Sequence, residues 1–443
     1  MQTKGEARFI AMSDHGLNVC AASARISTTD GTALEIFGKG DGGERDLKLI
    51  RKVLGSGHKS LLEHHVFSLA LENVSVLVEQ FLIEFRLASF TVKSRRYVNF
   101  SGAGFYVPDS LSGDAREKYV AGMTDRFSDY NQLMALDIPK EDARFVLPYC
   151  FLSNFYLTCN ARELIHIICS MIYGRGSMFA ELVMLGEQLL SQFEAVYPGV
   201  IESEKAHYER CAVAPFEGEF HAASAVVPSI KLLSAPADPE SLLQGALQFT
   251  GRFPDLTLKQ AAQALVRDAR PRELECLSFT YLVKDVSLAS VTHYTRHRMQ
   301  SPLIKQVIAA VHRGAYIVPD TIAANEQAIR IYQNAFERNH QVLMEMMDMG
   351  MSYENASYFA LAGNVIDMMI TMNARELLHF LKLRTCTRAQ WEIQKLSVSL
   401  LEQLRTCSHT IFDSFGPSCA VELRCPEGRM SCGKPQFPKD VDA

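Results

Sequence analysis

The apolar and polar positions of this chain alternate between helical and β-prone spacing, and the same order of segments occurs twice. Each half has a β-prone opening, Ala7 to Cys20 in the first half, followed by helical stretches and a second β-prone segment, Glu63 to Asn73 or Glu275 to Asp285. An apolar helix then leads into an Arg-containing turn and an aromatic–Pro strand end. We expect an α+β fold in which long amphipathic helices close each half.

The longest helical stripe lies in the second half. Leu377, Leu378 and Leu381 are followed by apolar positions from Ile393 to Leu404, all at helical spacing. This pattern predicts a helix over Asn373 to Leu404.

A sequence motif repeats once at a long distance. Asn160-Ala161-Arg162-Glu163-Leu164 recurs 213 positions later as Asn373-Ala374-Arg375-Glu376-Leu377. A histidine follows each copy, at His166 and at His379. An internal repeat of this length predicts two copies of one domain.

Two further matches support the repeat. Phe105-Tyr106-Val107-Pro108 matches Tyr316-Ile317-Val318-Pro319, and Glu141 matches Glu354. We predict tandem domains at residues 1–215 and 216–443, which together form a pseudo-dimer. The join falls in the proline-punctuated region 200–235, where helical periodicity weakens.

Composition fits a folded protein with a sizeable core. Apolar residues make up 48% of the 443 residues and charged residues 21%, which excludes a disordered or fibrous chain. The formal net charge of −5 argues against a general nucleic-acid binder. No apolar stretch reaches the roughly 20 residues that cross a bilayer, and residues 1–8 lack the apolar core of a signal peptide. We expect a cytoplasmic protein without membrane or nucleic-acid partners.

The eleven cysteines stand mostly in apolar contexts, which is typical of reduced, buried thiols. A terminal group comprises Cys407, Cys419, Cys425 and Cys432, with His409 nearby. It contains no Cys-x-x-Cys knuckle, so we expect reduced thiols, and a metal site is the alternative.

Charged side chains interrupt an apolar stretch of the second half. Arg296-His297-Arg298 lies within Ser290 to Val311, where charge is unfavourable unless it is paired or liganded. The triplet indicates an anionic ligand, a phosphate or an electron-rich ring, and a surface salt-bridge patch is the alternative. His293 would share a face with Arg296 and His297 if the helix continues.

A similar run in the first half combines guanidinium and hydroxyl groups at a predicted turn. Such groups are typical of phosphate binding, although they are equally common in loops. The run consists of Arg86, Ser89, Ser94, Arg95, Arg96 and Tyr97.

These residues resemble the signature of the flavin-dependent thymidylate synthases, Arg-His-Arg-x-x-Ser-x-Asn-x-x-Ser-x-Arg. The second copy keeps the first four specified positions, Arg296, His297, Arg298 and Ser301, and loses the last three. The first copy keeps Arg86, Ser89, Ser94 and Arg96. Together the copies supply every specified position except the Asn.

Three other segments resemble the same family. Gly57 to His64 is similar to the segment that lies against flavin and folate. Ala143 to Pro148 is similar to the segment whose arginine, here Arg144, grips the nucleotide. Asn373 to Glu392 is similar to the C-terminal helix, whose later arginine, here Arg384, also contacts the nucleotide.

The resemblance implies a flavin-dependent methyltransferase that converts dUMP to dTMP. Methylenetetrahydrofolate would supply the carbon, and FAD, reduced by NADPH, would supply the hydride. It implies catalytic roles for Arg384, His58 and His293 and no metal. The implied nucleotide-binding residues are Ser94, Arg95, Arg96, Arg144 and Arg384. The implied cofactor-binding residues are Arg296, His297, Arg298, Ser60, Glu63, Asn373, Arg375 and His379.

The two copies have lost complementary parts of this set. The first keeps His58, Ser60, Glu63, Ser94, Arg96 and Arg144, and the second keeps Arg296, His297, Arg298 and Arg384. The family assembles its sites at the interfaces of a homotetramer, so we expect a homodimer of this chain to form a pseudo-tetramer. Whether each site forms within or between chains stays open, and two decaying copies of an inactive enzyme are the alternative.

Departures from the family pattern leave other functions open. His293 replaces a Gln, the signature Asn is Thr91 or Leu303, and the acidic residue beside it is Val92 or Ile304. A UMP or other pyrimidine C5-methylase is one alternative. A non-catalytic protein of the same fold that binds flavin or nucleotide is the other.

Overall fold

The computed structural model describes residues 5–210 and 218–434 and divides the chain into two compact units. Unit 1 consists of Met1–Phe220 together with Ala324–Leu361, and unit 2 consists of His221–Ala323 together with Ala362–Ala443. A segment of the second repeat therefore packs within unit 1. The domain limits at residues 1–215 and 216–443 describe the repeat and stay a prediction.

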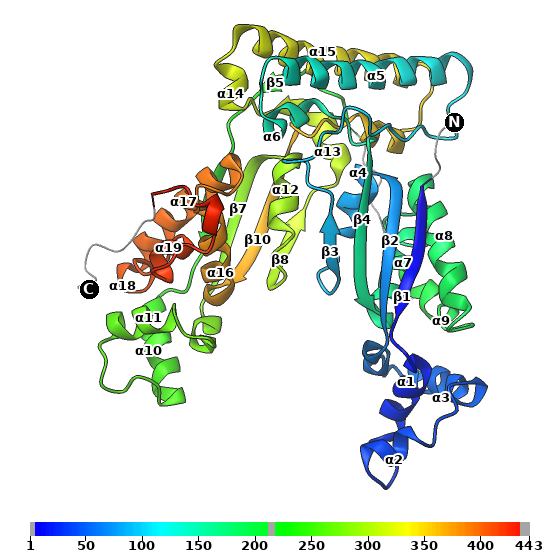
Figure 1. The fold of residues 1–443 in the computed structure, drawn as a ribbon, viewed down its shortest axis with the longest axis vertical. Coiled ribbons are helices and arrows are strands. Elements are labelled where there is room, and N and C mark those ends of the chain that lie inside the picture. The colour runs from blue at the N-terminus through cyan, green and yellow to red at the C-terminus, as the bar shows by residue number, and fades with distance from the viewer. Residues whose placement is uncertain (1–4, 211–217, 435–443) are drawn as a thin grey trace. The chain divides into compact units, whose positions relative to one another are not determined.

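Unit 1 is built on a four-stranded antiparallel sheet (Figure 1). Inward side chains such as Phe67, Leu69 and Leu71 are buried, because alternate residues of a strand point to one face. Two long helices, α7 and α8, cover that face. In sheet order the strands are β1 (Glu6–Met12), β2 (Val66–Ser75), β4 (Leu152–Asn160) and β3 (Ser89–Val92); the helices are α7 (Ala161–Ile172) and α8 (Ala180–Glu194).

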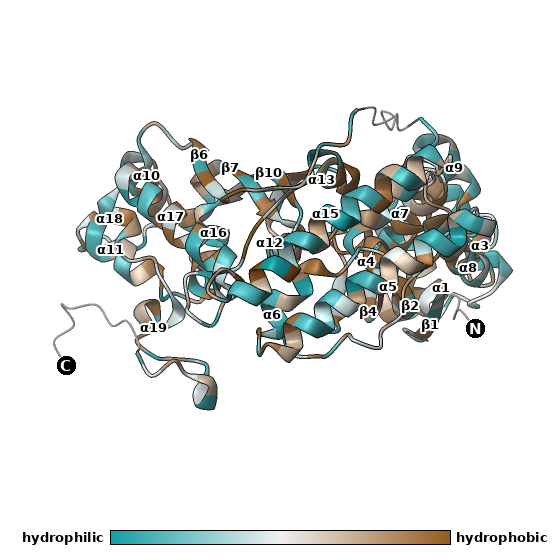
Figure 2. Cartoon of the chain, turned by 90° about the horizontal axis from the view of Figure 1, so that it is seen from above, coloured by the Kyte–Doolittle hydropathy of each residue, from teal (hydrophilic) through white to brown (hydrophobic). Residues whose placement is uncertain are grey.

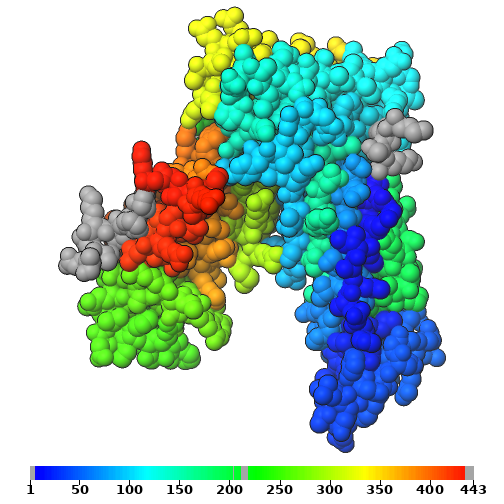
Figure 3. Space-filling view, viewed as in Figure 1, coloured from blue at the N-terminus to red at the C-terminus, as the bar shows by residue number. Residues whose placement is uncertain are grey.

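A group of three helices lies at one end of the unit 1 sheet, in blue in Figure 3. The predicted β-prone opening Ala7 to Cys20 is wrong in its second part, because helix begins at Gly16. Cys20 and Ala21 are buried on the inner face of this helix, one turn beyond the buried Gly16. The group is α1 (Gly16–Arg25), α2 (Ala33–Phe37) and α3 (Glu44–Gly55); α9 (Glu202–Tyr208) and the 3₁₀ turn η1 (Ser60–His64) complete this part.

Unit 2 repeats the same sheet order, which confirms an α+β fold in tandem copies. Its helices α16 and α17 stand where α7 and α8 stand in unit 1. In sheet order the strands are β6 (Ser229–Ser234), β7 (Ser278–Ser287), β10 (Val365–Asn373) and β8 (Gln300–Ile304); the helices are α16 (Ala374–Arg384) and α17 (Trp391–Cys407). A short parallel pair joins β5 (Ser224–Ala225) to β9 (Ala315–Tyr316).

The single helix predicted over Asn373 to Leu404 is wrong, because the segment forms two helices with a turn between them. Gln390 begins α17, and its side-chain oxygen accepts hydrogen bonds of 3.1 Å from the backbone N–H groups of Glu392 and Ile393. Asn373 ends β10 and caps α16 through the N–H of Glu376, at 2.9 Å. The apolar stripe continues across the turn because both helices bury leucines in the core of unit 2.

Shorter elements complete each unit. Unit 1 also contains α4 (Val76–Leu82), α6 (Lys140–Ala143), η2 (Arg144–Val146) and η4 (Glu354–Phe359). Unit 2 also contains α10 (Pro239–Thr250), α11 (Leu258–Leu265), η3 (Arg272–Cys276), α12 (Leu288–Tyr294), α13 (Val307–Arg313), α14 (Asp320–Ala323), α18 (His409–Phe412), α19 (Ser418–Val421) and η5 (Gly428–Met430). Among the described residues, no helix is long and apolar enough to cross a membrane.

Two equivalent 23-residue helices pair within unit 1, α5 (Gly113–Ala135) and α15 (Glu326–Asp348). Both show teal and brown residues in Figure 2, as expected for helices with one buried face. They run antiparallel, because the start of α5 meets the end of α15. A Cβ on Gly122 would lie only 2.8 Å from Cγ1 of Val342, so glycine permits the close approach of the two helices.

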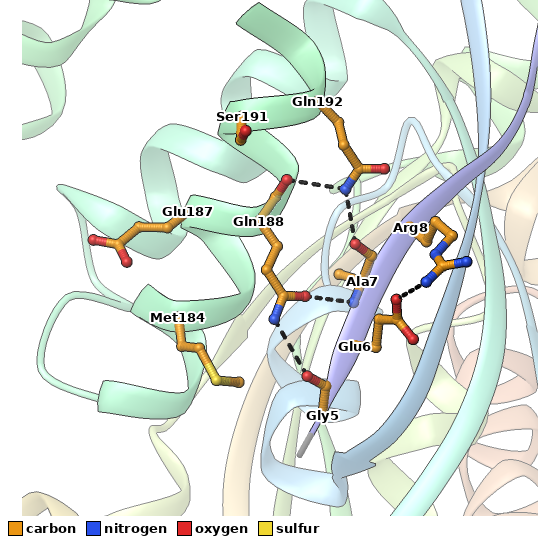
Figure 4. A pocket seen from close by; sticks show the side chains of 9 residues that line it. All are labelled: Gly5, Glu6, Ala7, Arg8, Met184, Glu187, Gln188, Ser191 and Gln192. Atoms are coloured by element: carbon orange, nitrogen blue, oxygen red, sulfur yellow. Dashed lines mark hydrogen bonds and ion pairs between the residues drawn. The ribbon is translucent and has the colours of Figure 1, made fainter. Parts of the chain in front are cut away.

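Glutamine side chains close the outer edges of both sheets. Among the strands of the described residues, β1 pairs only with β2. Gln188 and Gln192 of α8 bond to its other edge in Figure 4, where they help to line a surface pocket. Gln192 accepts from the N–H of Phe9 at 2.7 Å and donates to the carbonyl of Ala7 at 2.9 Å. In unit 2, Gln403 makes the equivalent bonds to β6, to Leu232 N at 2.7 Å and to Ile230 O at 3.0 Å.

Candidate functional site

The charged residues predicted to bind a ligand follow a short apolar helix in each unit. In unit 2 this helix, α12, begins after Ser287, whose side chain accepts from the N–H of Ser290 at 3.2 Å. It ends at Tyr294, so the helix does not continue and the condition for His293 to share a helical face with Arg296 and His297 is not met. The N–H of His297 instead donates to the carbonyl of Tyr294 at 3.0 Å, which forms a turn.

Unit 1 gathers three predicted arginines, Arg95, Arg96 and Arg144, around two carboxylates. Arg95 forms an ion pair with Glu79, which is 1% exposed and also accepts from Ser153 Oγ at 2.7 Å. Arg96 Nε lies 2.6 Å from Oε1 of Glu141. The buried Asp142 adds a third carboxylate beside Arg144, so the three guanidinium groups are balanced in number and the case for an anionic ligand rests on the free donor of Arg144.

Arg144 is the most enclosed arginine of this cluster, at 4% exposure. Its Nε donates to the carbonyl of Glu141 at 3.0 Å, and its buried Nη2 has no hydrogen-bond partner. Burial, with a further contribution from Arg95, lowers the pKa of Arg144 to about 10. A buried guanidinium with an unused donor can gain a charge-assisted hydrogen bond from an anion.

Ser94 lies in the same loop, and its Oγ accepts from the N–H of Arg96 at 3.4 Å. The other predicted residues of unit 1 lie on and beside η1. His58 and Ser60 are exposed, and Glu63 forms an ion pair of 2.5 Å with Arg162 at the start of α7. These side chains are accessible to a ligand.

Three polar side chains of unit 2, Arg384, His297 and Glu376, form a continuous hydrogen-bonded chain. Arg384 Nε donates to Nε2 of His297 at 3.1 Å, so the proton of the neutral imidazole is on Nδ1, 3.2 Å from Oε1 of Glu376. Burial, followed by the charge of Arg384, holds the pKa of His297 well below its usual range. Burial raises the pKa of Glu376. His297 therefore stays neutral and orients Arg384.

The residues around this chain differ in exposure. His293 is buried, and its carbonyl accepts from Arg384 Nη2 at 3.1 Å. Arg296 and Arg298 are exposed on either side of buried His297, so the triplet is not a surface patch throughout.

Three predicted residues lie on α16 or at its N-terminal cap. Asn373 caps the helix, Arg375 forms an ion pair with Glu275, and the ring of His379 lies 5.5 Å from that of His297. The structure thus brings Arg384, His297 and His379 together within unit 2.

Each unit fills the place of its lost residues differently. In unit 1, Phe85 and Met171 stand at the positions of His297 and Arg384, and both are buried. Arg175 stacks its guanidinium 4.4 Å from the ring centre of Phe81, the counterpart of His293. In unit 2, buried Ser357 stands where unit 1 has Arg144. The losses of the two copies therefore have different packing consequences.

Sequence reasoning missed the carboxylates that organise both clusters. Glu79 is the one acidic residue in the apolar run Val76–Leu82, and this was a usable signal because an unpaired charge is unfavourable there. Glu376 appeared only as part of the repeated motif. Its partner His297 lies 79 positions away, a contact that no local pattern indicates.

The cysteines of the described chain carry free thiols. Within residues 5–210 and 218–434, no group of three or more His, Cys, Asp or Glu side chains could hold a metal ion.

Comparison with known proteins agrees with the repeated fold. The family described as thymidylate synthase complementing protein (Thy1) matches residues 8–199 and again residues 237–408. The flavin-dependent thymidylate synthase of Geobacter sulfurreducens is 35% identical over 164 residues, which cover 36% of this chain and 70% of that protein. The enzyme of Clostridium tetani with the same name is 32% identical over 178 residues, covering 36% and 71%.

Two solved structures are also similar. A UMP/dUMP methylase PolB from Streptomyces cacaoi, bound with 5-Br dUMP, is 26% identical with a TM-score of 0.40, over 48% of this chain and 99% of that chain. Thymidylate synthase X from Helicobacter pylori, with FAD and dUMP, is 21% identical with a TM-score of 0.38, over 46% and 100%.

The fold and the two clusters define a tandem-duplicated α+β protein with a buried arginine cluster in one unit and a histidine–arginine chain in the other. Both halves match a single family over most of their length. The chain belongs to the thymidylate synthase complementing protein (Thy1) family.

Proposed function

We propose that this protein is a flavin-dependent thymidylate synthase that methylates dUMP to dTMP with methylenetetrahydrofolate and NADPH. FAD, when bound, supplies the hydride that completes the methyl group. The relatives named above, which are flavin-dependent thymidylate synthases, support this reaction class.

The observation that carries the proposal is the unused donor of Arg144 in unit 1. A nucleotide 5′-phosphate presents several acceptor oxygens, and each charge-assisted hydrogen bond is worth about 1.5–3 kcal/mol. Arg96 and Arg144 would bind the phosphate, with Ser94 in the same loop. Arg95 forms an ion pair with Glu79, and its positive charge lowers the pKa of Arg144.

Unit 2 would contribute the groups that face the reacting ring and the flavin. Arg384 carries a fixed positive charge, and neutral His297 orients it without competing for the proton. A positive charge near the pyrimidine carbonyls favours electron density in the ring as C6 accepts hydride. The exposed Arg296 and Arg298 fit the anionic diphosphate of FAD. Asn373, Arg375 and His379 would add contacts from α16 or its start, where the ring of His379 lies 5.5 Å from that of His297.

The direct test measures dTMP formed from dUMP, methylenetetrahydrofolate, FAD and NADPH. Arg144→Ala and Arg384→Ala should each lower product formation by at least about 100-fold, which corresponds to about 2.7 kcal/mol. Arg330→Ala is a matched control, because this exposed arginine of α15 forms only a 4.0 Å ion pair. Equal losses in all three variants would contradict the proposed site.

The assignment of different groups to the two halves has its own test. Mixing the Arg144→Ala and Arg384→Ala proteins under conditions that exchange subunits should restore activity if a homodimer builds each site from two chains. If each site uses one chain, the mixture stays inactive while the wild-type protein remains active. Both single variants must still bind flavin, so that the result of the mixing experiment reports on the nucleotide site and not on loss of the cofactor.

A ribonucleotide substrate is the second candidate. It is favoured by the loss of the signature Asn, replaced by Thr91 and Leu303, which are both exposed on the edge strands β3 and β8. Competition between dUMP and UMP in the same assay measures the preference. Flavin binding without product from either nucleotide would instead identify a non-catalytic flavin-binding protein.

A further inference from the structure

Glu376 ends the hydrogen-bonded chain of unit 2, at the ring nitrogen of His297 that does not meet Arg384. Its Oε1 lies 3.2 Å from Nδ1 of His297, and Nε2 of the same ring accepts from Arg384 Nε at 3.1 Å. Both Glu376 and His297 are buried. A buried carboxylate is unfavourable unless it accepts hydrogen bonds, so the ring proton and the carboxylate satisfy each other.

The position of the proton on His297 decides whether this chain holds together. A neutral imidazole has one N–H and one bare nitrogen, and a guanidinium can only donate. Nε2 must therefore be bare to accept from Arg384, and the proton on Nδ1 needs an acceptor. Without Glu376, the proton can move to Nε2, where it would face an N–H of Arg384 and break the bond between them.

A second hydrogen bond helps to fix the direction of the Arg384 guanidinium. Arg384 is the last residue of α16, and its Nη2 donates to the backbone carbonyl of His293 at 3.1 Å. Two bonds, from Nε and from Nη2, fix the plane of the group. The bond to His293 alone would hold one corner and leave the group able to tilt.

Unit 1 retains the carboxylate without the imidazole. Glu163 has the equivalent place on α7 and is buried, and its N–H donates to Oδ1 of Asn160 at 2.9 Å, the same bond that begins α16. The ring at the position of His297 is Phe85, which has no nitrogen. A carboxylate in the first turn of a helix also interacts favourably with the helix dipole, and that role is common to both copies. In unit 2 the carboxylate has the imidazole as a further partner.

We propose that Glu376 is a positioning residue, whose carboxylate keeps the proton of His297 on Nδ1 so that Nε2 holds Arg384 in the direction of the nucleotide. The proposal rests on the proposed function, in which the charge of Arg384 stabilises the pyrimidine as C6 accepts hydride. Glu376 accepts a hydrogen bond and exchanges no atom with the substrate. A group that acts in the transition state is sensitive to displacements of about 1 Å, which can lower a rate about 100-fold.

Two substitutions separate the hydrogen bond from the size of the side chain. Glu376→Leu removes the acceptor, and Glu376→Gln keeps an oxygen that accepts from the Nδ1–H of His297. In the dTMP assay we expect Glu376→Leu to lower kcat about 10-fold to 100-fold. KM for dUMP should change less, because Arg384 keeps its charge and its bond to His293. Glu376→Gln should retain most of the wild-type kcat.

Glu163→Leu is the matched control, at the equivalent buried position of unit 1. It removes the same kind of carboxylate from the first turn of a helix and should leave kcat unchanged. An equal fall in kcat in Glu163→Leu and Glu376→Leu would reduce Glu376 to a structural role and overturn the proposal. A Glu376→Gln protein as impaired as Glu376→Leu would overturn it too, because its acceptor is intact.

A double-mutant cycle tests whether Glu376 acts through His297. His297→Phe gives unit 2 the ring that unit 1 has at this position. In this background Glu376→Leu should have little further effect on kcat, because the carboxylate no longer has an N–H to hold. Additive losses would mean a separate role for Glu376 and would contradict the proposal.

The position of the ring proton gives a readout that does not depend on activity. Burial holds the pKa of His297 well below its usual range, so the ring stays uncharged at neutral pH. Nitrogen-15 spectra of histidine-labelled protein, with the His297 signals identified by their loss in His297→Phe, should show the proton on Nδ1 in the wild-type protein and in Glu376→Gln.

In Glu376→Leu the same spectra should show the proton at least partly on Nε2, and an unchanged ring would overturn the proposal even in an active enzyme. A shifted proton in a protein whose wild type makes no dTMP would instead contradict the proposed function. It would still support the role of Glu376 in holding His297, so the two failures are distinguishable.

Discussion

Arg144 holds a positive charge where the protein stabilises it poorly. Its pKa of about 10, against an ordinary value of 12.5, corresponds to a penalty on the order of 3 kcal/mol for the charged form in the fold. The nearest groups include two further arginines, Arg95 and Arg96. A buried charge that destabilises the ligand-free protein is better explained by a role in ligand binding than by a role in stability.

Arg144→Met should therefore separate stability from binding. A methionine keeps much of the packing and removes the buried charge, so we expect the free energy of unfolding to stay equal or rise by about 1–3 kcal/mol. The affinity for dUMP should fall at least about 10-fold, or about 1.4 kcal/mol. Urea unfolding and calorimetric titration measure the two quantities. A variant that is both less stable and unchanged in dUMP affinity would contradict this account.

Glu181 is a second buried charge, in the core of unit 1. Its carboxylate accepts from Ser75 N at 2.8 Å, from Ser75 Oγ at 2.6 Å and from the hydroxyl of Tyr358 at 2.9 Å. Burial nevertheless raises the pKa of Glu181 to about 7. The folded state thus binds the proton more tightly than the unfolded state, whose pKa lies near 4.5.

The raised pKa of Glu181 makes the stability of the folded protein depend on pH. Between about pH 4.5 and pH 7 the folded state holds more protons, so this group makes stability fall as pH rises, by up to about 3 kcal/mol. Glu181→Gln should remove this slope while keeping a polar partner for Tyr358. Thermal unfolding of both proteins at pH 5 and pH 8 checks it. Equal pH dependence in the two proteins would show that Glu181 ionises normally.

At the residue scale, the sequence predicted which arginines and histidines matter but not which partners hold them. The spacing of Arg95 and Arg96 was readable from the chain. Their pairing with Glu79 and Glu141 depends on the return of distant segments to one loop. The same holds for Glu376 and His297, which meet only when α16 packs against the turn that follows α12.

At the scale of elements, glutamines of α8 and α17 satisfy backbone groups on the exposed edge strands of the two sheets. An unpaired strand edge offers its N–H and C=O groups to other chains, which promotes aggregation. Gln192 and Gln403 each satisfy one donor and one acceptor of the edge strand, and they stand at equivalent positions of the two copies.

Gln192→Ala should weaken this edge. Two hydrogen bonds are lost at β1, and each is worth about 0.5–1.5 kcal/mol, so we expect a loss of about 1–3 kcal/mol and faster hydrogen exchange at Phe9. Gln192→Glu is the comparison variant, since it can still accept from Phe9 and loses the donor to the carbonyls of Ala7 and Gln188. Its effect should be smaller than that of the alanine. Light scattering at raised temperature reports whether the open edge also promotes association.

Element types followed from the pattern more closely than element ends. The equivalence of α7 with α16 was visible in the repeated Asn-Ala-Arg-Glu-Leu motif. The break between α16 and α17 was not, because the leucine stripe persists on both sides of the turn. The helical start at Gly16 was likewise hidden, since the segment from Ala7 to Cys20 contains residues common in strands.

At the scale of the whole molecule, the α5–α15 pair joins the two halves of the sequence inside unit 1. Asp129 accepts from Arg126 Nε at 2.9 Å and from Arg338 Nη2 at 2.6 Å. Arg126 is 1% exposed and also donates to the carbonyl of Ala335 at 2.8 Å. The sequence predicted long amphipathic helices in each half without giving these two ranges, and no pattern shows which helix each one packs against.

Asp129→Ala should destabilise unit 1 strongly. It leaves the buried Arg126 without its carboxylate, which typically costs about 3–5 kcal/mol. Replacing both partners, as Arg126→Met with Asp129→Leu, should recover most of this loss. Arg338→Ala should cost no more than about 1 kcal/mol, because Arg338 is 46% exposed. Urea unfolding of the three variants checks the order, and equal losses would contradict it.

The placement of Ala324–Leu361 in unit 1 also sets an order of events during synthesis. The ribosome releases Met1–Phe220 first, yet α5 lacks its longest helical partner until α15 emerges. Most of the strands of unit 2 are made in the meantime, so the nascent chain must keep an apolar helical face covered or soluble while more than one hundred further residues are translated. The half that begins to fold first is therefore completed only after most of the second half has been translated.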